Sequence, residues 1–300
     1  MNATVTAASS RLRGYEVSER AFRRLALAAA AMLLVIVATG ATVRLTASGL
    51  GCEHWPGCQP GDPFPDKGYH SYVEFSNRVV AFLTIVATLG CWIGSLFAAS
   101  ARRWVRRLAA AVFVGTLAQA PLGAITVYYD LNPYLVITHL LLSLVVLGLG
   151  VVVAARGAGA ALGLRARQLS GFLFAAVTFL VVTGTFATAA GKFPGSSGGK
   201  YVQRVGTFEP SVALHVKAVA IFGAAFLLLA GWAWRNRVLW LVRGCAALLA
   251  ILLGQMAVGE AQYRMYGTIP WWVVLLHVTL AATLFAWTVG LVVRVWRPAH

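Results

Sequence analysis

The chain has 300 residues, of which 59% are hydrophobic and only 11% are charged, and its formal net charge is +16. So apolar a composition excludes an ordinary water-soluble domain. The basic residues are divided among several connections between apolar runs, which argues against a nucleic-acid-binding surface.

Apolar runs follow one another along the whole chain. A hydrocarbon core of ~30 Å takes about 20 mostly apolar helical residues to cross. None of the runs alternates polar and apolar residues as the strands of a membrane barrel would. We therefore predict an all-α integral membrane protein with eight transmembrane helices, at residues 25–46, 72–98, 105–127, 134–155, 169–190, 211–233, 239–259 and 271–293.

Lysine and arginine mark one side of the predicted protein. Most of them lie before the first run and in every second connection after it, and such an excess is typical of the cytoplasmic side. We therefore expect both termini to face the cytoplasm. Few positive residues lie on or near the predicted outer side: Arg44, Lys67, Arg78, Lys192, Lys200, Arg204, Lys217 and Arg264.

The start of the second run carries polar residues that share a helix face. The segment YVEFSNRVVA places Glu74 and Asn77 three residues apart, with Arg78 next to them. One interpretation is a plain interfacial helix start, since a glutamate interacts favourably with the N-terminal end of a helix dipole. The other is a catalytic Glu74, acting with Asn77 and Arg78 beside a bound iron, where it accepts protons or stabilises a developing cation.

Lone histidines lie in three of the later runs. His139 is in the fourth run, His215 in the sixth and His277 in the eighth. Ionisable groups inside a membrane are costly and usually functional, although an interhelical hydrogen bond would also explain any one of them. All three histidines, like Asn77, lie near the outer start of their runs, so we expect these four residues at one depth.

Two histidines on different helices at one depth suit axial ligation of a haem iron. Zinc would take further cysteine, histidine or carboxylate ligands, and none accompanies His215 and His277. We therefore interpret the second half of the chain as a bis-histidine haem site. The first half offers only His139 as an obvious axial ligand, because asparagine is no ordinary haem ligand. With one axial ligand, the first half is predicted to have an open iron face or an exchangeable haem.

The polar motifs of the first half recur in the second half. Four pairs keep the same order: Asn77 with His215, His139 with His277, QAPLG (Gln119 to Gly123) with QMAVG (Gln255 to Gly259), and Thr39-Gly40 with Thr183-Gly184. A basic segment rich in small residues, 156–170, separates the two sets. The repeat predicts two pseudo-symmetric four-helix bundles in the same orientation, residues 1–162 and 163–300.

These motifs resemble the haem A synthase family. The outer loop TASGLGCEHWPGCQPG, the helix start VEFSNR, both QxxxG segments and the spaced histidines match that family in order and spacing over roughly residues 22–295. The resemblance implies a membrane oxidoreductase that oxidises the methyl group of haem O to the formyl group of haem A, for cytochrome oxidase biogenesis. It also implies a haem B cofactor and a place in the bacterial cell membrane.

The resemblance further implies roles for single residues. Haem B would be ligated by His215 and His277 in the C-terminal bundle, and the iron of the substrate haem would be held by His139 in the N-terminal bundle. Glu74 matches the glutamate to which the family's catalytic role is assigned. The family usually has histidine at the position of Asn77, in an E-x-x-H-R pattern, and this chain departs from that pattern.

Two cysteines, Cys52 and Cys58, flank EHWPG in the first outer loop, an oxidising location where a disulfide would persist. A structural disulfide is one interpretation of the pair. A redox-active pair is another, and free thiols or a metal site with His54 are a third. The family resemblance favours the disulfide.

Two further classes of function remain open beside the synthase. One is a non-catalytic membrane b-type cytochrome for electron transfer, and the other is a haem-binding chaperone or transporter. For the synthase, the expected partners are haem O as substrate, the lipid bilayer, a haem O synthase and an electron-transfer partner. No nucleic acid is expected among them.

Overall fold

The computed structural model describes residues 16–55, 57–65, 68–156, 161–196 and 202–296. In this part of the chain there are eight helices and no β-strand, and each helix is long and apolar enough to cross a membrane. This confirms the predicted all-α membrane protein with eight spans. The helices are α2 (Glu19–Leu45), α3 (Tyr69–Phe97), α4 (Arg103–Tyr128), α5 (Pro133–Ala155), α6 (Leu164–Ala190), α7 (Phe208–Arg235), α8 (Leu239–Arg264) and α9 (Trp271–Trp296).

Several helices extend beyond the predicted apolar runs at their charged ends. α2 begins six residues before its predicted run at 25–46, because the Ser18 side chain accepts a hydrogen bond from the backbone N–H of Ala21 (3.2 Å) and caps the helix. Glu19, in the first turn, pairs with Arg156 at the end of α5 (3.2 Å). An apolar run ends at the first charges, whereas a helix continues until its caps. The positions of Lys67, Lys200 and both chain ends fall outside the described residues.

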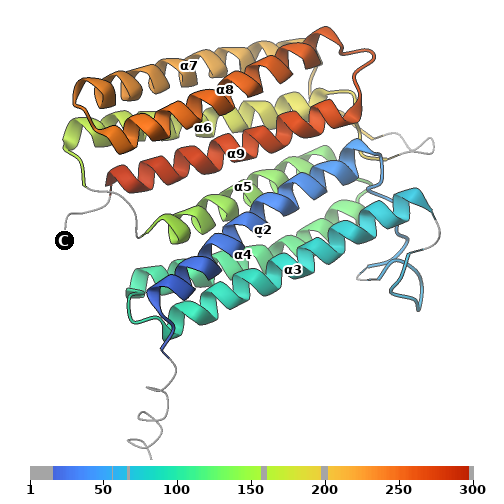
Figure 1. The fold of residues 1–300 in the computed structure, drawn as a ribbon. Helices are drawn as coiled ribbons and strands as arrows, with labels where there is room; N and C mark the ends of the chain where they lie inside the picture. The colour runs from blue at the N-terminus through green and yellow to red at the C-terminus, as the bar shows by residue number, and fades with distance from the viewer. Residues whose placement is uncertain (1–15, 56, 66–67, 157–160, 197–201, 297–300) are drawn as a thin grey trace, which may run out of the picture.

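The helices form two groups of four (Figure 1). In the first group α2 packs on α3 and α5, and α4 also packs on both α3 and α5. In the second group α6 packs on α7 and α9, and α8 also packs on both α7 and α9. α9 and α5 lie where the groups meet, and α9 also contacts α2. These contacts follow the order of the sequence repeat, with α2 to α5 in the places of α6 to α9.

The close contact between the groups depends on a small residue. A Cβ atom on Gly148 of α5 would lie 3.3 Å from the Phe285 ring of α9, so the glycine lets α9 approach closely.

Two loops are joined at one end of the helices, the end that we predict to face outward and therefore call outer. Ser48 and Ser196 form an antiparallel bridge, and the backbone N–H of Gly49 donates to the carbonyl of Gly195 (2.9 Å). The Arg44 guanidinium, at the end of α2, donates to the carbonyls of Phe193 (3.2 Å) and Thr188 (3.1 Å). The end of the first helix is thereby fastened to the connection that follows α6, so one end of the molecule forms a continuous cover across both groups.

Candidate functional site

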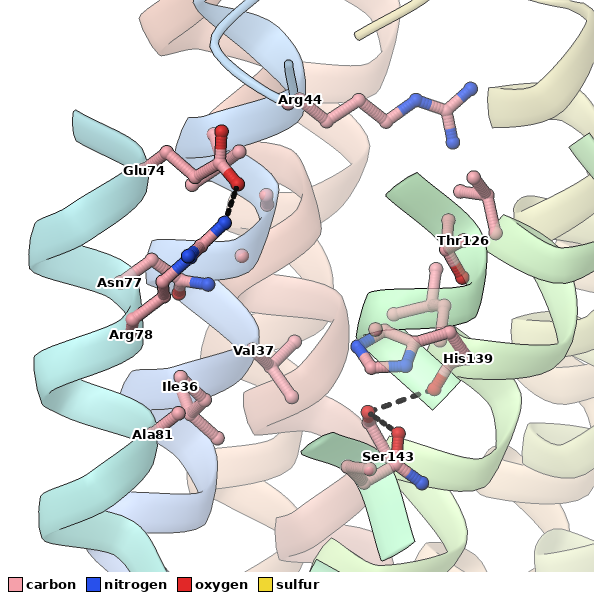
Figure 2. A pocket seen from close by; sticks show the side chains of 18 of the residues that line it. Ile36, Val37, Arg44, Glu74, Asn77, Arg78, Ala81, Thr126, His139 and Ser143 are labelled. Carbon is pink, nitrogen blue, oxygen red and sulfur yellow. Dashed lines mark hydrogen bonds and ion pairs between the residues drawn. The ribbon is translucent and has the colours of Figure 1, made fainter. Parts of the chain in front are cut away.

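A cavity of about 650 Å³ lies within the first group of helices, a size usual for a small-molecule or cofactor site. The joined outer loops reach it, since Trp55, Pro194 and Gly195 are part of its lining. Much of the wall is aliphatic, which suits a flat apolar ligand. Its polar side chains include Gln119 and, labelled in Figure 2, Arg44, Glu74, Asn77, Arg78, His139 and Ser143.

Glu74 lies at the outer end of this cavity and is only 5% exposed. Its Oε2 atom accepts hydrogen bonds from the backbone N–H groups of Gly51 (2.7 Å) and Cys52 (2.9 Å). Its Oε1 atom pairs with Arg78 one turn further along α3 (2.7 Å). Charge-assisted bonds of this kind are stronger than neutral ones, so the carboxylate is fixed in place by its own helix and by the outer loop.

The outer loop over Glu74 is closed by a disulfide between Cys52 and Cys58, which confirms that prediction. The Cys58 carbonyl accepts hydrogen bonds from two backbone N–H groups within the loop. Arg78 donates to the carbonyl of His54 (2.7 Å) and to that of Gly57. The disulfide loop, residues 52–58, is therefore held over the cavity by the same arginine that holds Glu74.

Asn77 lies on α3 and His139 on α5, on opposite sides of the cavity (Figure 2). The Asn77 Oδ1 atom accepts a hydrogen bond from the Thr39 hydroxyl of α2 (2.7 Å). The His139 Nδ1 atom is buried and has no hydrogen-bond partner among the described residues. Close by, the Ser143 hydroxyl donates to the Gln119 Oε1 atom (3.1 Å). An imidazole in the wall of a cavity can serve as a metal ligand.

The second group brings His215 of α7 and His277 of α9 next to each other, with the edge of one ring toward the face of the other. Their ring centres are 6.4 Å apart and the ring planes are inclined at 72°. The Thr183 hydroxyl of α6 lies 3.2 Å from the His215 Nδ1 atom. A second-sphere hydrogen bond on Nδ1 orients a histidine so that its Nε2 atom can face a metal.

The spacing of the two rings fits a haem iron between them. A ligating imidazole nitrogen lies ~2 Å from its metal, and the ring centre about 1 Å further, so two axial rings have centres ~6 Å apart. The observed 6.4 Å agrees with this arrangement. Gly184 and Gly259 make room for the rings, because a Cβ atom there would lie 2.9 Å from His215 and 3.1 Å from His277. No group of three or more candidate metal ligands occurs in the described parts of the chain, which disfavours a zinc site.

The structure brings the sequence-predicted residues together as two sets. Glu74, Asn77, Arg78 and His139 all line the cavity of the first group. His215 and His277 lie next to each other in the second group. Sequence reasoning used the two Thr-Gly pairs only as markers of a repeat and missed that each threonine bonds to the ligand position of the next helix. It also missed Ser143 and Arg44, for which the sequence gives no periodic signal.

The chain matches a protein family over most of its length. Residues 23–289 match the model of the COX15-CtaA family, described as cytochrome oxidase assembly protein.

Similar proteins include the haem A synthase of Bacillus pumilus, 32% identical over 132 residues, which are 42% of this chain and 41% of that protein. The haem A synthase of Symbiobacterium thermophilum is 35% identical over 111 residues, 36% of this chain and 35% of that protein. That of Geobacillus kaustophilus is 31% identical over 112 residues, 35% of this chain and 33% of that protein. The chain thus matches less than half the length of these relatives.

Proposed function

This chain belongs to the COX15-CtaA family of cytochrome oxidase assembly proteins, and we propose that it is a haem A synthase, which oxidises the methyl group of haem O to the formyl group of haem A. The names of the similar proteins support this activity. The observation that carries the proposal is the contrast between a closed histidine pair, at 6.4 Å, and an open cavity of about 650 Å³ with one histidine in its wall. A fixed cofactor needs a closed site, and a substrate that must enter and leave needs an open one.

The cavity in the first group is proposed as the haem O site. His139 would ligate the substrate iron, and the aliphatic wall would accommodate the macrocycle. The reaction replaces two hydrogens of a methyl group by one oxygen, as successive hydroxylations followed by loss of water. It removes four electrons, so an electron-transfer partner is needed.

The second group is proposed as the haem B site, with His215 and His277 as axial ligands. Haem B supplies one-electron redox chemistry there. The protein's contribution is to fix both rings, through Thr183 at the His215 Nδ1 atom and through the close glycines Gly184 and Gly259. We propose residues 1–162 as the substrate half and residues 163–300 as the cofactor half.

Glu74 is proposed as the catalytic carboxylate. Its two oxygens are held by Gly51, Cys52 and Arg78, so it brings a fixed charge to the cavity without reorganisation. A preorganised charge stabilises a cation that develops on the substrate carbon. Release of the Arg78 contact would free one oxygen to take up a proton from the reacting group.

We further propose a location in the bacterial cell membrane with both termini in the cytoplasm. The disulfide loop then lies on the oxidising side, where a disulfide persists. The opposite ends of the helices carry clustered arginines, as the cytoplasmic side does in other membrane proteins. They include Arg20, Arg23, Arg24, Arg102, Arg103, Arg106, Arg107, Arg235, Arg237 and Arg243. A haem O synthase in the same membrane is the expected source of substrate.

Asn77 favours a second candidate function. With asparagine at the usual histidine position, the first group could bind haem without converting it, as a haem carrier or as part of a b-type cytochrome.

The test is co-expression of the full chain with a haem O-producing enzyme, followed by chromatography and mass spectrometry of the extracted haems. Haem A, or its hydroxylated precursor, that forms only when the chain is present supports the synthase. Unchanged haem O in a preparation that contains haem B and a competent electron donor and acceptor would favour the carrier or cytochrome.

A further inference from the structure

We infer that the substrate haem has a single protein ligand, His139, and that Asn77 leaves the other face of the iron open to a small ligand such as water, to which the Asn77 amide donates a hydrogen bond. The inference rests on the proposed function, because it takes the cavity in the first group to be the haem O site. It concerns the coordination of the iron and therefore has a spectroscopic readout independent of turnover.

The first observation is that, in each half, a threonine hydroxyl contacts the side chain at the same position of the sequence repeat. Thr183 donates to the Leu180 carbonyl (3.0 Å) and contacts the His215 Nδ1 atom (3.2 Å). The Thr39 hydroxyl donates to the Asn77 Oδ1 atom (2.7 Å) and lies 3.3 Å from the Ile36 carbonyl. The support that orients a ligand ring in the second half is retained in the first half, where it holds an amide. Asn77 thus occupies the position of an axial ligand.

The second observation is that no other side chain replaces the missing histidine. The usual haem ligands are histidine, cysteine, methionine and tyrosine. Among the described residues that line the cavity, His139 is the only one of these four types. The nearby His70 is not part of the lining, and its Nδ1 atom is hydrogen-bonded to the Ser48 hydroxyl (3.0 Å). The carboxylate of Glu74 is fixed by three donors.

The third observation is what Asn77 offers to the cavity. The hydrogen bond from Thr39 fixes its Oδ1 atom, and the amide nitrogen makes no hydrogen bond to a described residue. An asparagine side chain is also shorter than a histidine side chain. An iron ligated by His139 would therefore face a gap that ends in an N–H donor. Such a gap admits a water molecule or a diatomic ligand and stabilises it by a hydrogen bond.

The test compares the spin state and ligand binding of the two haems in the full chain, purified from cells that make haem O. We expect ferric wild-type protein to show a low-spin signal from the His215–His277 site and a high-spin signal from the cavity. After reduction, carbon monoxide should bind to about half of the haem, because only one of the two sites has an open face. His139→Ala should remove the high-spin signal and the carbon monoxide binding together.

Asn77→His is the decisive variant, since it restores the family pattern. We expect the high-spin signal to become low-spin and the apparent carbon monoxide affinity to fall about tenfold or more, because the new ring must leave the iron first. Asn77→Ala is the matched control: it should keep the high-spin signal and weaken the bound ligand by loss of the donor. The retained low-spin signal of the second half reports that each variant is folded.

Three results would overturn the inference. One is wild-type protein that holds two haems, both low-spin and both inert to carbon monoxide. Another is wild-type protein whose only haem is low-spin. The third is an Asn77→His variant with an unchanged high-spin signal, because Asn77 would then not face the iron. If the expected spectra are found but no haem A forms, the single-ligand site stands and the proposed synthase activity fails.

Discussion

The two groups of helices have the same arrangement but differ in how closely their glycines approach the matching side chains. In the second group a Cβ atom on Gly184 or Gly259 would lie 2.9 or 3.1 Å from the nearest histidine atom. At the matching places of the first group, Gly40 and Gly123, the distances to Asn77 and His139 are 4.0 and 3.7 Å. The second group is packed tightly around its two histidines, and the first group is packed more loosely around Asn77 and His139. A protein with one permanent and one exchangeable haem needs this difference, because close packing fixes a cofactor and also prevents its release.

The largest expected contrast comes from removing one histidine from each group. His277→Ala should abolish the low-spin haem, since a single axial ring cannot give the bis-histidine spectrum. His139→Ala should leave that haem in place and lose only the haem of the cavity. The measurement is haem content and absorption spectrum of the purified variants. Equal loss of both haems in both variants would show that the two groups are not separate sites.

Glu74 should matter for conversion and not for the second group. We expect Glu74→Ala to lower the formation of haem A by about 100-fold or more, as for loss of other preorganised charges. Glu74→Gln keeps the shape and two of the hydrogen bonds but not the charge, and should be nearly as inactive. Haem A formation is measured by chromatography, with the low-spin haem of His215 and His277 as the folding control. Full conversion by Glu74→Ala would remove Glu74 from the catalytic site.

Matched glycine substitutions measure directly how closely each group packs around these side chains. Gly184→Ala should displace the His215 ring and cost about 1–3 kcal/mol of stability, because the added methyl overpacks the site. Gly40→Ala adds a methyl group at 4.0 Å from Asn77 and should be neutral or stabilising by up to about 1 kcal/mol, since alanine is the better helix former. Thermal unfolding in detergent and the low-spin spectrum test both. The same effect in the two variants would contradict the looser packing of the first group.

Among the described residues, the disulfide loop occurs in the first group and has no equivalent disulfide in the second. Cys52→Ser should lower the free energy of unfolding of the cover by about 2 kcal/mol, the value for a short closed loop. Because Cys52 N–H and Arg78 connect this loop to Glu74, haem A formation should fall as well. Cys91→Ser, at a buried free cysteine, is the control. Limited proteolysis of the loop and haem A formation are measured together.

The smallest effects should come from the two threonines. Thr183→Val removes the hydroxyl at His215 and should destabilise the haem B site by about 1 kcal/mol, seen as a shift of its reduction potential. Thr39→Val should leave that potential unchanged and alter carbon monoxide binding in the cavity instead, since Thr39 holds Asn77. A shift of the haem B potential by Thr39→Val would mean that the two sites are electrically or mechanically linked.

Much of the fold followed from local patterns. The apolar runs predicted all eight helices of the described chain, with errors mainly at charged ends such as that of α2. The recurrence of Gln119 with Gln255, and of His139 with His277, predicted the repeat that the helix contacts follow. The residues to which we assign ligand or catalytic roles were all named from the sequence, whereas Ser143 and Arg44 of the cavity wall were not named as site residues. Their roles stay proposals, and the division at residues 162 and 163 stays a prediction.

The partners of those residues could not be predicted. Glu74 is held by backbone N–H groups more than twenty residues earlier in the chain. Almost every residue type has a backbone N–H group, so the sequence does not reveal such contacts. The connection after α6 was only a Gly- and Ser-rich loop in the sequence. In the structure its residues Pro194 and Gly195 form part of the cavity wall.

The sequence by itself determined the membrane class and the eight spans, and it predicted a common depth for Asn77, His139, His215 and His277. These properties depend on hydropathy and on position along single helices, which are local quantities. Only the tertiary structure decided that Thr39 holds Asn77, that Arg78 fastens the disulfide loop, and that the first group holds a cavity while the second packs closely around its histidines. The groups differ by 1.1 Å between Gly40 (4.0 Å) and Gly184 (2.9 Å), and by 0.6 Å between Gly123 (3.7 Å) and Gly259 (3.1 Å). Distances of that size are set by how neighbouring helices pack against each other, and no pattern within one helix encodes them.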